Sequence, residues 1–442
     1  MAVVKERLSI LRQKMQLLSQ TTTDRNTLYL YIEVIFAGIL AAAGAFNSAY
    51  ILRAGGSKTL VGLLSSLPSL VAVFTFMPSA RILERKTHYG PWVVGSLFLA
   101  RVGYVFIMAL PFLGISYLPE ITVALLVAMT IPSVFFSTGW SPLLSDVVPA
   151  RSRANVLAWR SILSSATIAP LTYLAGKWLD YAPFPGNYQW LYGIGFLAGA
   201  ISVYFCSRIR ITASSEKPTP AAETQKQPWI AALRTAAREN PRFLRIIINT
   251  FMFDFSAWMV GPLYIIFFVQ NLNATDSWIG LHTSLAHIGV VVGYWIWRRI
   301  IYRIGEAKAL LIALPLATTY AFMVALVPNL TFILFAGFLI NVFNPGVGLS
   351  HGVIFLDLLP QGKKHGATAM YSMVMHVGAF TAPLIGVAVS NRIGIVPTLL
   401  IGGTMRFLGA LLFYIFPVKG ERQKIGLPHA IILPRMFGGT RK

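Results

Sequence analysis

Residues 244–269 read LRIIINTFMFDFSAWMVGPLYIIFFV, an almost wholly apolar stretch in which Arg245 and Asp254 carry the only charges. A helix of about 20 predominantly apolar residues is long enough to cross the hydrocarbon core of a bilayer. Helices suit that environment because each one satisfies its own backbone hydrogen bonds, which lipid cannot do. The stretch therefore predicts a membrane-spanning helix with one carboxylate near its middle.

Eleven further apolar stretches predict that the chain crosses the membrane twelve times. The first six expected spans lie near residues 27–51, 59–80, 91–113, 120–144, 155–176 and 188–207. The second six lie near residues 244–269, 277–299, 308–327, 330–354, 367–390 and 396–417. The expected fold class is therefore an all-α integral membrane protein with two six-helix bundles.

The overall composition agrees with this interpretation. Of the 442 residues, 56% are hydrophobic and only 12% are charged, about half of the charged share that a soluble domain carries. Such a composition excludes a soluble globular protein and a disordered chain. The single cysteine, Cys206, cannot form a disulfide within the chain, which excludes a disulfide scaffold.

The basic residues predict the orientation in the membrane. The chain carries 37 Lys and Arg residues against 15 Asp and Glu residues, a formal net charge of +22. Of the basic residues, only Arg53, Lys58, Lys177 and Arg392 fall in the loops after odd-numbered spans. Because basic loops stay on the cytoplasmic side, both termini are expected in the cytoplasm and the chain in the plasma (inner) membrane. The net charge is thus a topology signal, and no nucleic-acid partner is expected.

The spans and the polar stretches between them predict five segments. These are a cytoplasmic amphipathic N-tail at 1–26, an N-terminal six-helix bundle at 27–208, a cytoplasmic linker at 209–242, a C-terminal six-helix bundle at 243–417 and a basic cytoplasmic tail at 418–442. In the N-tail, apolar residues recur at helical spacing with Lys and Arg on the other faces. This pattern predicts a helix on the anionic inner leaflet of the bilayer, with a solvated tail as the alternative.

The two halves of the chain share short motifs in the same order, which indicates an internal repeat. The matched motifs are Gly62-Leu63 with Gly280-Leu281, Asp146-Val147-Val148-Pro149 with Asp357-Leu358-Leu359-Pro360, and Ala169-Pro170-Leu171 with Ala382-Pro383-Leu384. Because each half has an even number of spans, the repeats are parallel and related by an axis along the membrane normal. Secondary transporters are built in this way, with the substrate site between the halves near the midplane. A duplicated scaffold without transport activity is the alternative.

This arrangement resembles the major facilitator superfamily across roughly residues 27–417. That family carries the motif Gly-x-x-x-Asp-Arg-x-Gly-Arg-Lys in the loop after its second span, where the motif braces the cytoplasmic gate. Here residues 80–89 read ARILERKTHY, with Glu84 in the place of the acid and Arg85 in the place of the base, while both glycines are missing. The second-half copy keeps Arg303 and lacks the acid.

The resemblance implies that charged groups at the cytoplasmic helix ends form a gate. An arginine–carboxylate pair can hold two helices together in one state and release them in another. The candidates are Glu84, Arg85, Asp146, Arg303 and Asp357. For the two aspartates, which end the fourth and tenth spans, the alternative is a helix-end charge placed by the water boundary.

Ionisable groups inside the expected spans are the strongest functional candidates. A charged side chain near the bilayer centre costs about 2.5–3.5 kcal/mol on insertion scales, so such residues tend to be kept for function. Asp254 lies well inside the seventh span, and Glu33 lies in the first part of the first span. Burial disfavours the charged form of a carboxylate, which allows either residue to carry a proton and couple it to transport. The alternatives are a structural pair with a buried arginine for Asp254 and a helix-start carboxylate for Glu33.

Other polar residues within spans are candidates for the substrate cavity. They are Asn47, Trp140, His287, Asn341, Asn344 and His376. The two asparagines of the tenth span share one helical face and precede Pro345, where a break in the helix is expected to free backbone carbonyls for a ligand. Polar packing is the alternative for the cavity candidates. Arg101 and Arg406 are expected to pair or to snorkel, because their helices lie outside the cavity in the resembled family.

The chain lacks the motifs of other functional classes. It has no histidines or acidic residues at metal-ligand spacing and no glycine-rich nucleotide-binding loop, so neither an enzyme, nor an ATP-driven pump, nor a bound cofactor or metal is expected.

The expected function is secondary active transport of a small organic solute by alternating access, driven by a proton gradient, in a monomer. The alternative is a transporter-like scaffold for lipid or pigment handling or for the assembly of a membrane complex.

Overall fold

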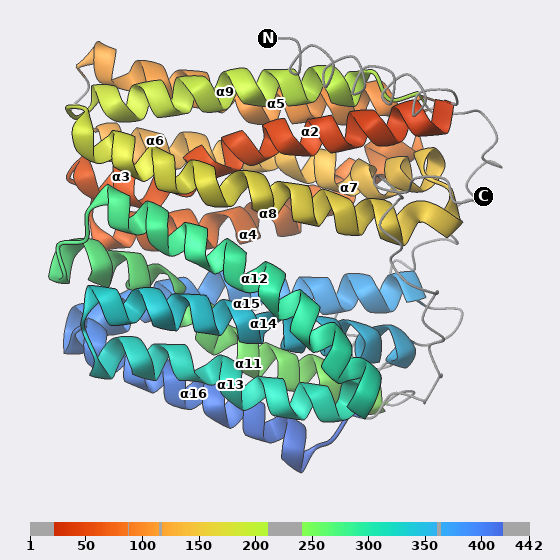
Figure 1. Ribbon diagram of the computed structural model, residues 1–442, viewed down its shortest axis with the longest axis vertical. Helices are drawn as coiled ribbons and strands as arrows, with labels where there is room; N and C mark the ends of the chain where they lie inside the picture. The colour runs from red at the N-terminus through yellow and green to blue at the C-terminus, as the bar shows by residue number, and fades with distance from the viewer. Residues whose placement is uncertain (1–21, 87, 115–116, 211–240, 360–363, 419–442) are drawn as a thin grey trace, which may run out of the picture.

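The computed structural model describes residues 22–86, 88–114, 117–210, 241–359 and 364–418 (Figure 1). The first half contains α2 (Thr22–Gly44), α3 (Asn47–Arg53), α4 (Lys58–Glu84), α5 (Gly90–Ala109), the 3-10 helix η1 (Leu110–Leu113), α6 (Leu118–Ala128), α7 (Thr130–Val147), α8 (Ala150–Tyr181) and α9 (Gly186–Ser207). The second half contains α11 (Pro241–Ile266), the π-helix η2 (Phe267–Asn271), α12 (Asp276–Ile304), α13 (Glu306–Leu326), α14 (Leu330–Leu358), α15 (Lys364–Ile393) and α16 (Ile395–Ile415). The expected all-α fold class is confirmed.

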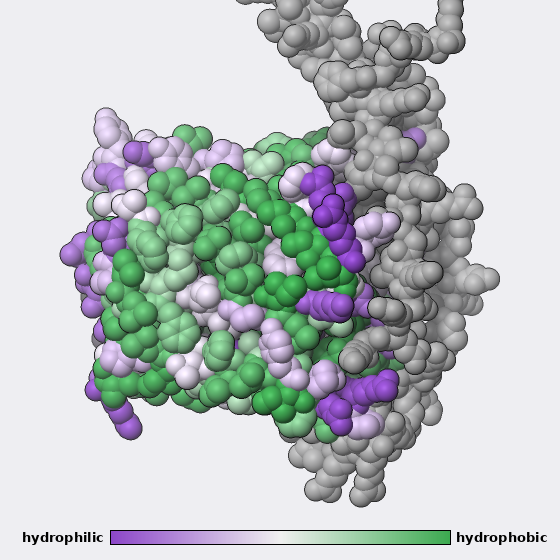
Figure 2. All heavy atoms as spheres, turned by 60° about the horizontal axis from the view of Figure 1, so that its bottom comes forward, coloured by the Kyte–Doolittle hydropathy of each residue, from purple (hydrophilic) through white to green (hydrophobic). Residues whose placement is uncertain are grey.

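Eleven segments of the described chain are long and apolar enough to cross a membrane. The remaining expected span, the fifth at 155–176, lies within α8, which is less apolar on average because it carries charged residues toward both of its ends. With 32 residues, α8 is still about 48 Å long, more than the roughly 30 Å of a hydrocarbon core. The chain is therefore a multi-pass integral membrane protein, and Figure 2 shows an apolar belt between two hydrophilic margins.

The helices run back and forth between two ends of the molecule. We call the end at which α4, α7 and α14 finish the tail end, because the described chain also begins α2 and finishes α16 there. The opposite end, with the loops after α3, α8 and η2, is the distal end (Figure 1). The amphipathic N-tail, most of the linker and the basic C-tail expected from the sequence fall outside the described residues.

Two of the expected spans are interrupted, and one expected interruption is absent. The first span divides into α2 and α3 near Ala45, and the fourth divides into α6 and α7 at Met129. In the tenth span, α14 continues through Pro345, so the expected break in the helix is wrong. The indole N–H of Trp297, on the neighbouring α12, donates to the carbonyl of Val342 at 3.0 Å. A neighbouring helix thus donates a hydrogen bond to the backbone of α14 close to its proline.

The two halves meet through α8 with α12 and through α4 with α15. Near the distal end, the two helices of each pair approach each other closely at glycine residues. An added Cβ at Gly176 would lie 2.3 Å from the carbonyl oxygen of Asp276, and one at Gly280 would lie 2.2 Å from that of Thr172. A Cβ at Gly62 would lie 2.9 Å from a side chain of α15. Gly62 and Gly280 are matched in the sequence repeat, so the same position of each half contacts the other half.

Gly280→Ala is expected to destabilise the contact between α8 and α12, because the new methyl group meets backbone rather than a side chain that could move aside. Overpacking of this kind typically costs about 1–3 kcal/mol, so the purified protein should unfold at a lower temperature in detergent. Gly95→Ala is the matched control, since a Cβ at Gly95 has nothing within 4 Å. Equal melting temperatures for the two variants would contradict the tight contact.

Candidate functional site

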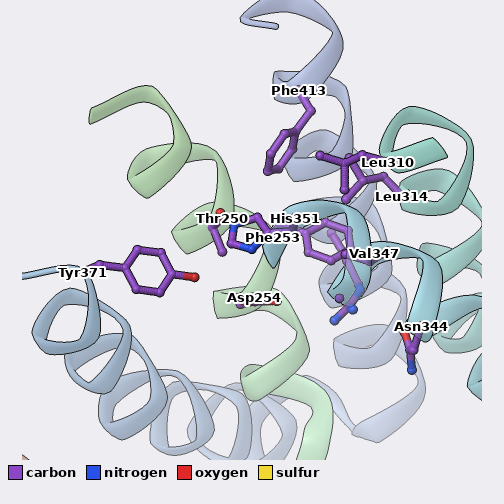
Figure 3. Close-up of a pocket in the computed structure, with 12 residues that line it drawn as sticks. Thr250, Phe253, Asp254, Leu310, Leu314, Asn344, Val347, His351, Tyr371 and Phe413 are labelled. Atoms are coloured by element: carbon purple, nitrogen blue, oxygen red, sulfur yellow. Dashed lines mark hydrogen bonds between the residues drawn. The ribbon is translucent and has the colours of Figure 1, made fainter. Parts of the chain in front are cut away.

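A cavity of about 240 Å³ lies inside the C-terminal bundle, among α11, α13, α14, α15 and α16 (Figure 3). Asp254 of α11, Asn344 of α14 and Arg406 of α16 line it. These three residues lie near the middle of their helices, so the cavity is deep in the membrane-spanning part of the protein. The expected proton-coupling residue Asp254 and the expected substrate-cavity residue Asn344 therefore line the same space.

A second cavity of about 220 Å³ adjoins the first, because Asn344 and Arg406 line both. Tyr264, Tyr320 and Asn341 contribute to the remaining wall of the second cavity. The side-chain amide of Asn341 donates to a backbone carbonyl one turn earlier in α14, at 2.8 Å. The guanidinium of Arg406 and the amide of Asn344 are thus available to a ligand in either of the two cavities.

Arg406 packs against an aromatic ring rather than against an anion. Its guanidinium lies 4.2 Å from the ring centroid of Phe253, and its Nε is buried with no hydrogen-bond partner. Close packing of α16 on α11 brings it there, since an added Cβ at Gly409 would lie 2.8 Å from the Cα of Phe253. Within the described residues, neither Arg406 nor Asp254 belongs to an ion pair of 4.0 Å or less. The two charges interact electrostatically across the cavity at a separation beyond that of a direct ion pair.

The first cavity has a polar side and an apolar side. On the polar side, Nε2 of His351 lies 2.7 Å from Oγ1 of Thr250, and the ring of His351 lies 6.2 Å from that of Tyr371. Figure 3 shows Tyr371 on one side of the cavity and Leu310 and Leu314 on another. A solute with both polar and apolar parts matches such a lining.

Glu33, the other expected proton-coupling residue, lies in the N-terminal bundle and is only 3% exposed. Its carboxylate lies 2.8 Å from Nη1 of Arg160 and 3.8 Å from Nη2 of Arg101. The hydroxyl of Ser202 donates to the same carboxylate at 2.9 Å, and both guanidiniums also donate to backbone carbonyls. The expected pairing of Arg101 is therefore observed. This Glu33 cluster ties α2, α5, α8 and α9 together.

Four of the six expected cavity residues lie elsewhere. The guanidinium of Arg160 lies 4.8 Å from the ring centroid of Trp140, which joins Trp140 to the Glu33 cluster. Asn47 begins α3 at the break in the first span, and its buried Oδ1 has no hydrogen-bond partner. His287 and His376 are half-buried on α12 and α15 and line neither of the two cavities. Among the six residues, the two asparagines of α14 reach these cavities.

Polar and charged contacts join the halves at the distal end. Arg53 donates to the carbonyl of Ala274 at 2.7 Å, and its Nε lies 3.6 Å from the carboxylate of Asp276. Asp180, beyond the expected fifth span, accepts hydrogen bonds from the backbone N–H groups of Asp276 and Ser277 at 2.8 and 3.0 Å. Burial alone would raise the pKa of Asp180, but the hydrogen bonds outweigh it and hold the pKa below its usual value. Asp180 thus caps the first turn of α12 as a carboxylate.

The expected gate residues all lie at the tail end, at or next to helix termini. They are Glu84, Arg85, Asp146, Arg303 and Asp357. The side chains of Arg85 and Arg303 are exposed. Asp146 accepts a hydrogen bond from the hydroxyl of Tyr89, which ties α7 to the start of α5 inside the N-terminal bundle. The gate itself stays a prediction.

Part of the cavity could not be identified from the sequence. A signal exists for Thr250 and His351, because Thr250 lies four residues before Asp254 and His351 lies seven residues after Asn344. These spacings place each pair on one face of its helix. For Arg406 no such signal exists, since its position depends on how α16 packs against α11.

Comparison with known proteins gives a family match for part of the chain and the fold of the whole. Residues 246–430 match the family model described as Major Facilitator Superfamily. A search of curated protein sequences found no significant match. Among solved structures, a POT family transporter in complex with 5-aminolevulinic acid is 11% identical with a TM-score of 0.71, and the comparison covers 89% of this chain and 96% of that chain.

Two further solved structures have the same fold. A mutant of the nucleoside transporter NupG is 12% identical with a TM-score of 0.65, over 88% of this chain and 99% of that chain. A bacterial homolog of the human lysosomal transporter Spinster, in an inward-facing and unoccupied conformation, is 14% identical with a TM-score of 0.60, over 90% of this chain and 98% of that chain. At such identities the likeness shows the fold alone. The chain is thus similar to the Major Facilitator Superfamily over residues 246–430, and it shares its fold with these transporters over 88–90% of its length.

Proposed function

We propose that the protein is a secondary active transporter that carries a small organic solute across the membrane by alternating access. The observation that carries the proposal is a charged cavity deep in the C-terminal bundle, in a molecule whose halves pack closely at the distal end. The solved structures of similar fold include one described as a nucleoside transporter and one that holds 5-aminolevulinic acid. The family match over residues 246–430 supports transport rather than catalysis.

The distal contacts support a state that opens toward the tail end. The glycine contacts of α8 with α12 and the hydrogen bonds of Asp180 hold the halves together at the distal end. Figure 1 shows α8 and α12 side by side there and diverging toward the tail end. In the alternate state these contacts break and the tail ends approach each other. The exposed Arg85 and Arg303 are positioned at helix ends that would then meet carboxylates.

Asp254 is the better candidate for the proton carrier of the two expected carboxylates. A proton carrier must be reached by water and must change partners during the cycle. Asp254 lines a cavity and belongs to no ion pair among the described residues. Glu33 is 3% exposed and already contacts two guanidiniums. We therefore assign proton coupling to Asp254 and a structural role to Glu33.

The proposed orientation has the tail end in the cytoplasm and the distal end outside the cell, in the plasma (inner) membrane. It rests on the excess of Lys and Arg in the tails and in the loops at the tail end. The same basic residues would contact the anionic lipids of the inner leaflet.

Accessibility to a membrane-impermeant maleimide in intact cells is expected to follow this orientation. In a Cys206→Ser background, Asn273→Cys at the distal end should react from outside, because Asn273 is exposed in a loop. His88→Cys, exposed at the tail end, should react only after the membrane is permeabilised. The opposite pattern of labelling would invert the proposed topology.

Asp254→Asn is expected to abolish uptake driven by a pH gradient in proteoliposomes, because an amide cannot carry a proton, while the variant stays folded. Glu33→Gln is expected to lower the stability by about 3–5 kcal/mol, because it leaves two buried guanidiniums without their anion. Proton flux with a panel of nucleosides, amino acids and short peptides, together with thermal unfolding, measures both effects.

The two carboxylate variants separate the competing roles. A wild-type rate and pH dependence for Asp254→Asn would exclude it as the coupling residue. A Glu33→Gln variant of normal stability that no longer couples protons would transfer the role to Glu33. Failure of the wild-type protein to move any solute, with stable co-purification of a membrane complex, would favour the scaffold alternative.

Arg85→Ala is expected to slow transport, because closure of the tail end would lose one cation of the gate. If its ion pair contributes about 1.4 kcal/mol to that closure, the rate should fall roughly tenfold. Arg208→Ala is the matched control, since Arg208 lies just beyond the tail end of α9 and lies over the ring of Tyr204 in its own bundle. Equal rates for the Arg85 and Arg208 variants would reject the gate.

A further inference from the structure

Two opposite charges of the C-terminal bundle line one cavity and interact across it without forming a direct ion pair. Asp254 and Arg406 line the first cavity from α11 and α16. In the part of the chain that the structure describes, all ion pairs of 4.0 Å or less involve other residues. Arg406 has the ring of Phe253 at 4.2 Å and a buried Nε without a hydrogen-bond partner. Both charges therefore have unused capacity for a ligand.

The N-terminal bundle shows a buried carboxylate of this protein that is paired directly with guanidiniums. Glu33 lies on the span that corresponds to that of Asp254, and it contacts Arg160 at 2.8 Å and Arg101 at 3.8 Å. Buried charges are normally paired in this way, because lipid and apolar side chains cannot solvate a charge as water does. Asp254 and Arg406 depart from that pattern, and they do so where a cavity lies against both of them.

We propose that this cavity binds a small zwitterion, with its ammonium group on Asp254, its carboxylate on Arg406 and an apolar side chain between them. The inference rests on the proposed function only in so far as the bound molecule is also the transported solute. A planar guanidinium presents paired N–H donors that match the two oxygens of a carboxylate. A carboxylate accepts hydrogen bonds from an ammonium group, which has three donors.

The rest of the lining fits the same ligand. Asn344 lines both cavities together with Arg406 and adds an amide donor to the same space. Leu310, Leu314 and Phe413 line the first cavity and provide the contact for an apolar side chain (Figure 3). At about 240 Å³ the cavity is below the usual range of roughly 300–1,000 Å³ for drug-sized ligands. It therefore suits a solute of amino-acid or dipeptide size.

Ligands with a single charge satisfy only one of the two groups. An anion would pair with Arg406 and leave Asp254 in the cavity with no cation. A cation would pair with Asp254 and leave the guanidinium with the Phe253 ring alone. A zwitterion satisfies both at once and brings no net charge into the membrane interior, where net charge is disfavoured.

The test measures binding to the purified full-length protein by isothermal titration calorimetry. The probes are leucine, phenylalanine and the dipeptide leucyl-leucine, each with its methyl ester and its N-acetyl derivative. We expect at least one zwitterion to bind, and its ester and N-acetyl forms to bind roughly thirtyfold or more weakly, as is typical when one partner of a buried charge pair is removed.

Two variants should each remove the contribution of one end of the ligand to the binding affinity. In Asp254→Asn, the N-acetyl derivative should bind as well as the zwitterion, because the cation has lost its partner. In Arg406→Gln, the methyl ester should bind as well as the zwitterion, because the carboxylate has lost its partner. Glu120→Gln and Arg299→Gln are matched controls with wild-type affinity, since both residues are exposed and Arg299 also lies over an aromatic ring, at 3.6 Å.

Several outcomes would overturn the zwitterion site. Equal wild-type affinity for the N-acetyl derivative would mean an anion site, and equal affinity for the ester would mean a cation site. Absence of binding for all three zwitterions would also reject it, whether or not the variants fold. Because calorimetry measures binding and not flux, the zwitterion site and the transport function are tested independently of each other. Zwitterion binding without flux rejects transport, and flux of another solute without zwitterion binding rejects only the site.

Discussion

A bilayer offers no partner to a charge or to an unpaired backbone group, and this constraint governs the whole chain. It forces the backbone into helices and confines most charges to the helix ends. It also means that each charge inside a bundle needs a partner that replaces water. In the N-terminal bundle, Glu33 lies 3.8 Å or less from two guanidiniums, which holds four helices together. In the C-terminal bundle, Asp254 and Arg406 are left apart beside a cavity.

The two repeats are alike where they meet and different inside. Gly62 and Gly280 occupy the same repeat position, and each lets a helix of its own half approach the other half at the distal end. Beside these backbone contacts and hydrogen bonds, apolar clusters contain buried residues of both halves, among them Ile51 and Val61 with Val387, so apolar packing also holds the distal ends together. In the proposed mechanism, the N-terminal bundle acts as a rigid partner, and the hollow C-terminal bundle holds the solute and the proton.

The fold and one charge of the site could be predicted from single residues and patterns, and the rest could not. Hydrophobic stretches longer than the bilayer core predict helices irrespective of packing, and an isolated Asp254 is conspicuous within such a stretch. By contrast, Trp140 was as good a cavity candidate as Asn344, yet Trp140 packs against Arg160. The helix break expected at Pro345 is absent, and Trp297 of the neighbouring helix donates a hydrogen bond to the backbone close to it.

The sequence by itself determined the membrane-spanning fold, the repeat and the positions of the rare charges along the helices, because these follow from the solvent that lipid provides. Only the tertiary structure decided which charges neutralise each other. Partner choice depends on the approach of helices distant in sequence, such as α16 on α11 over Gly409. That approach puts Arg406 against Phe253 and leaves it beside a cavity, whereas equally polar residues of the N-terminal bundle are joined into a closed cluster.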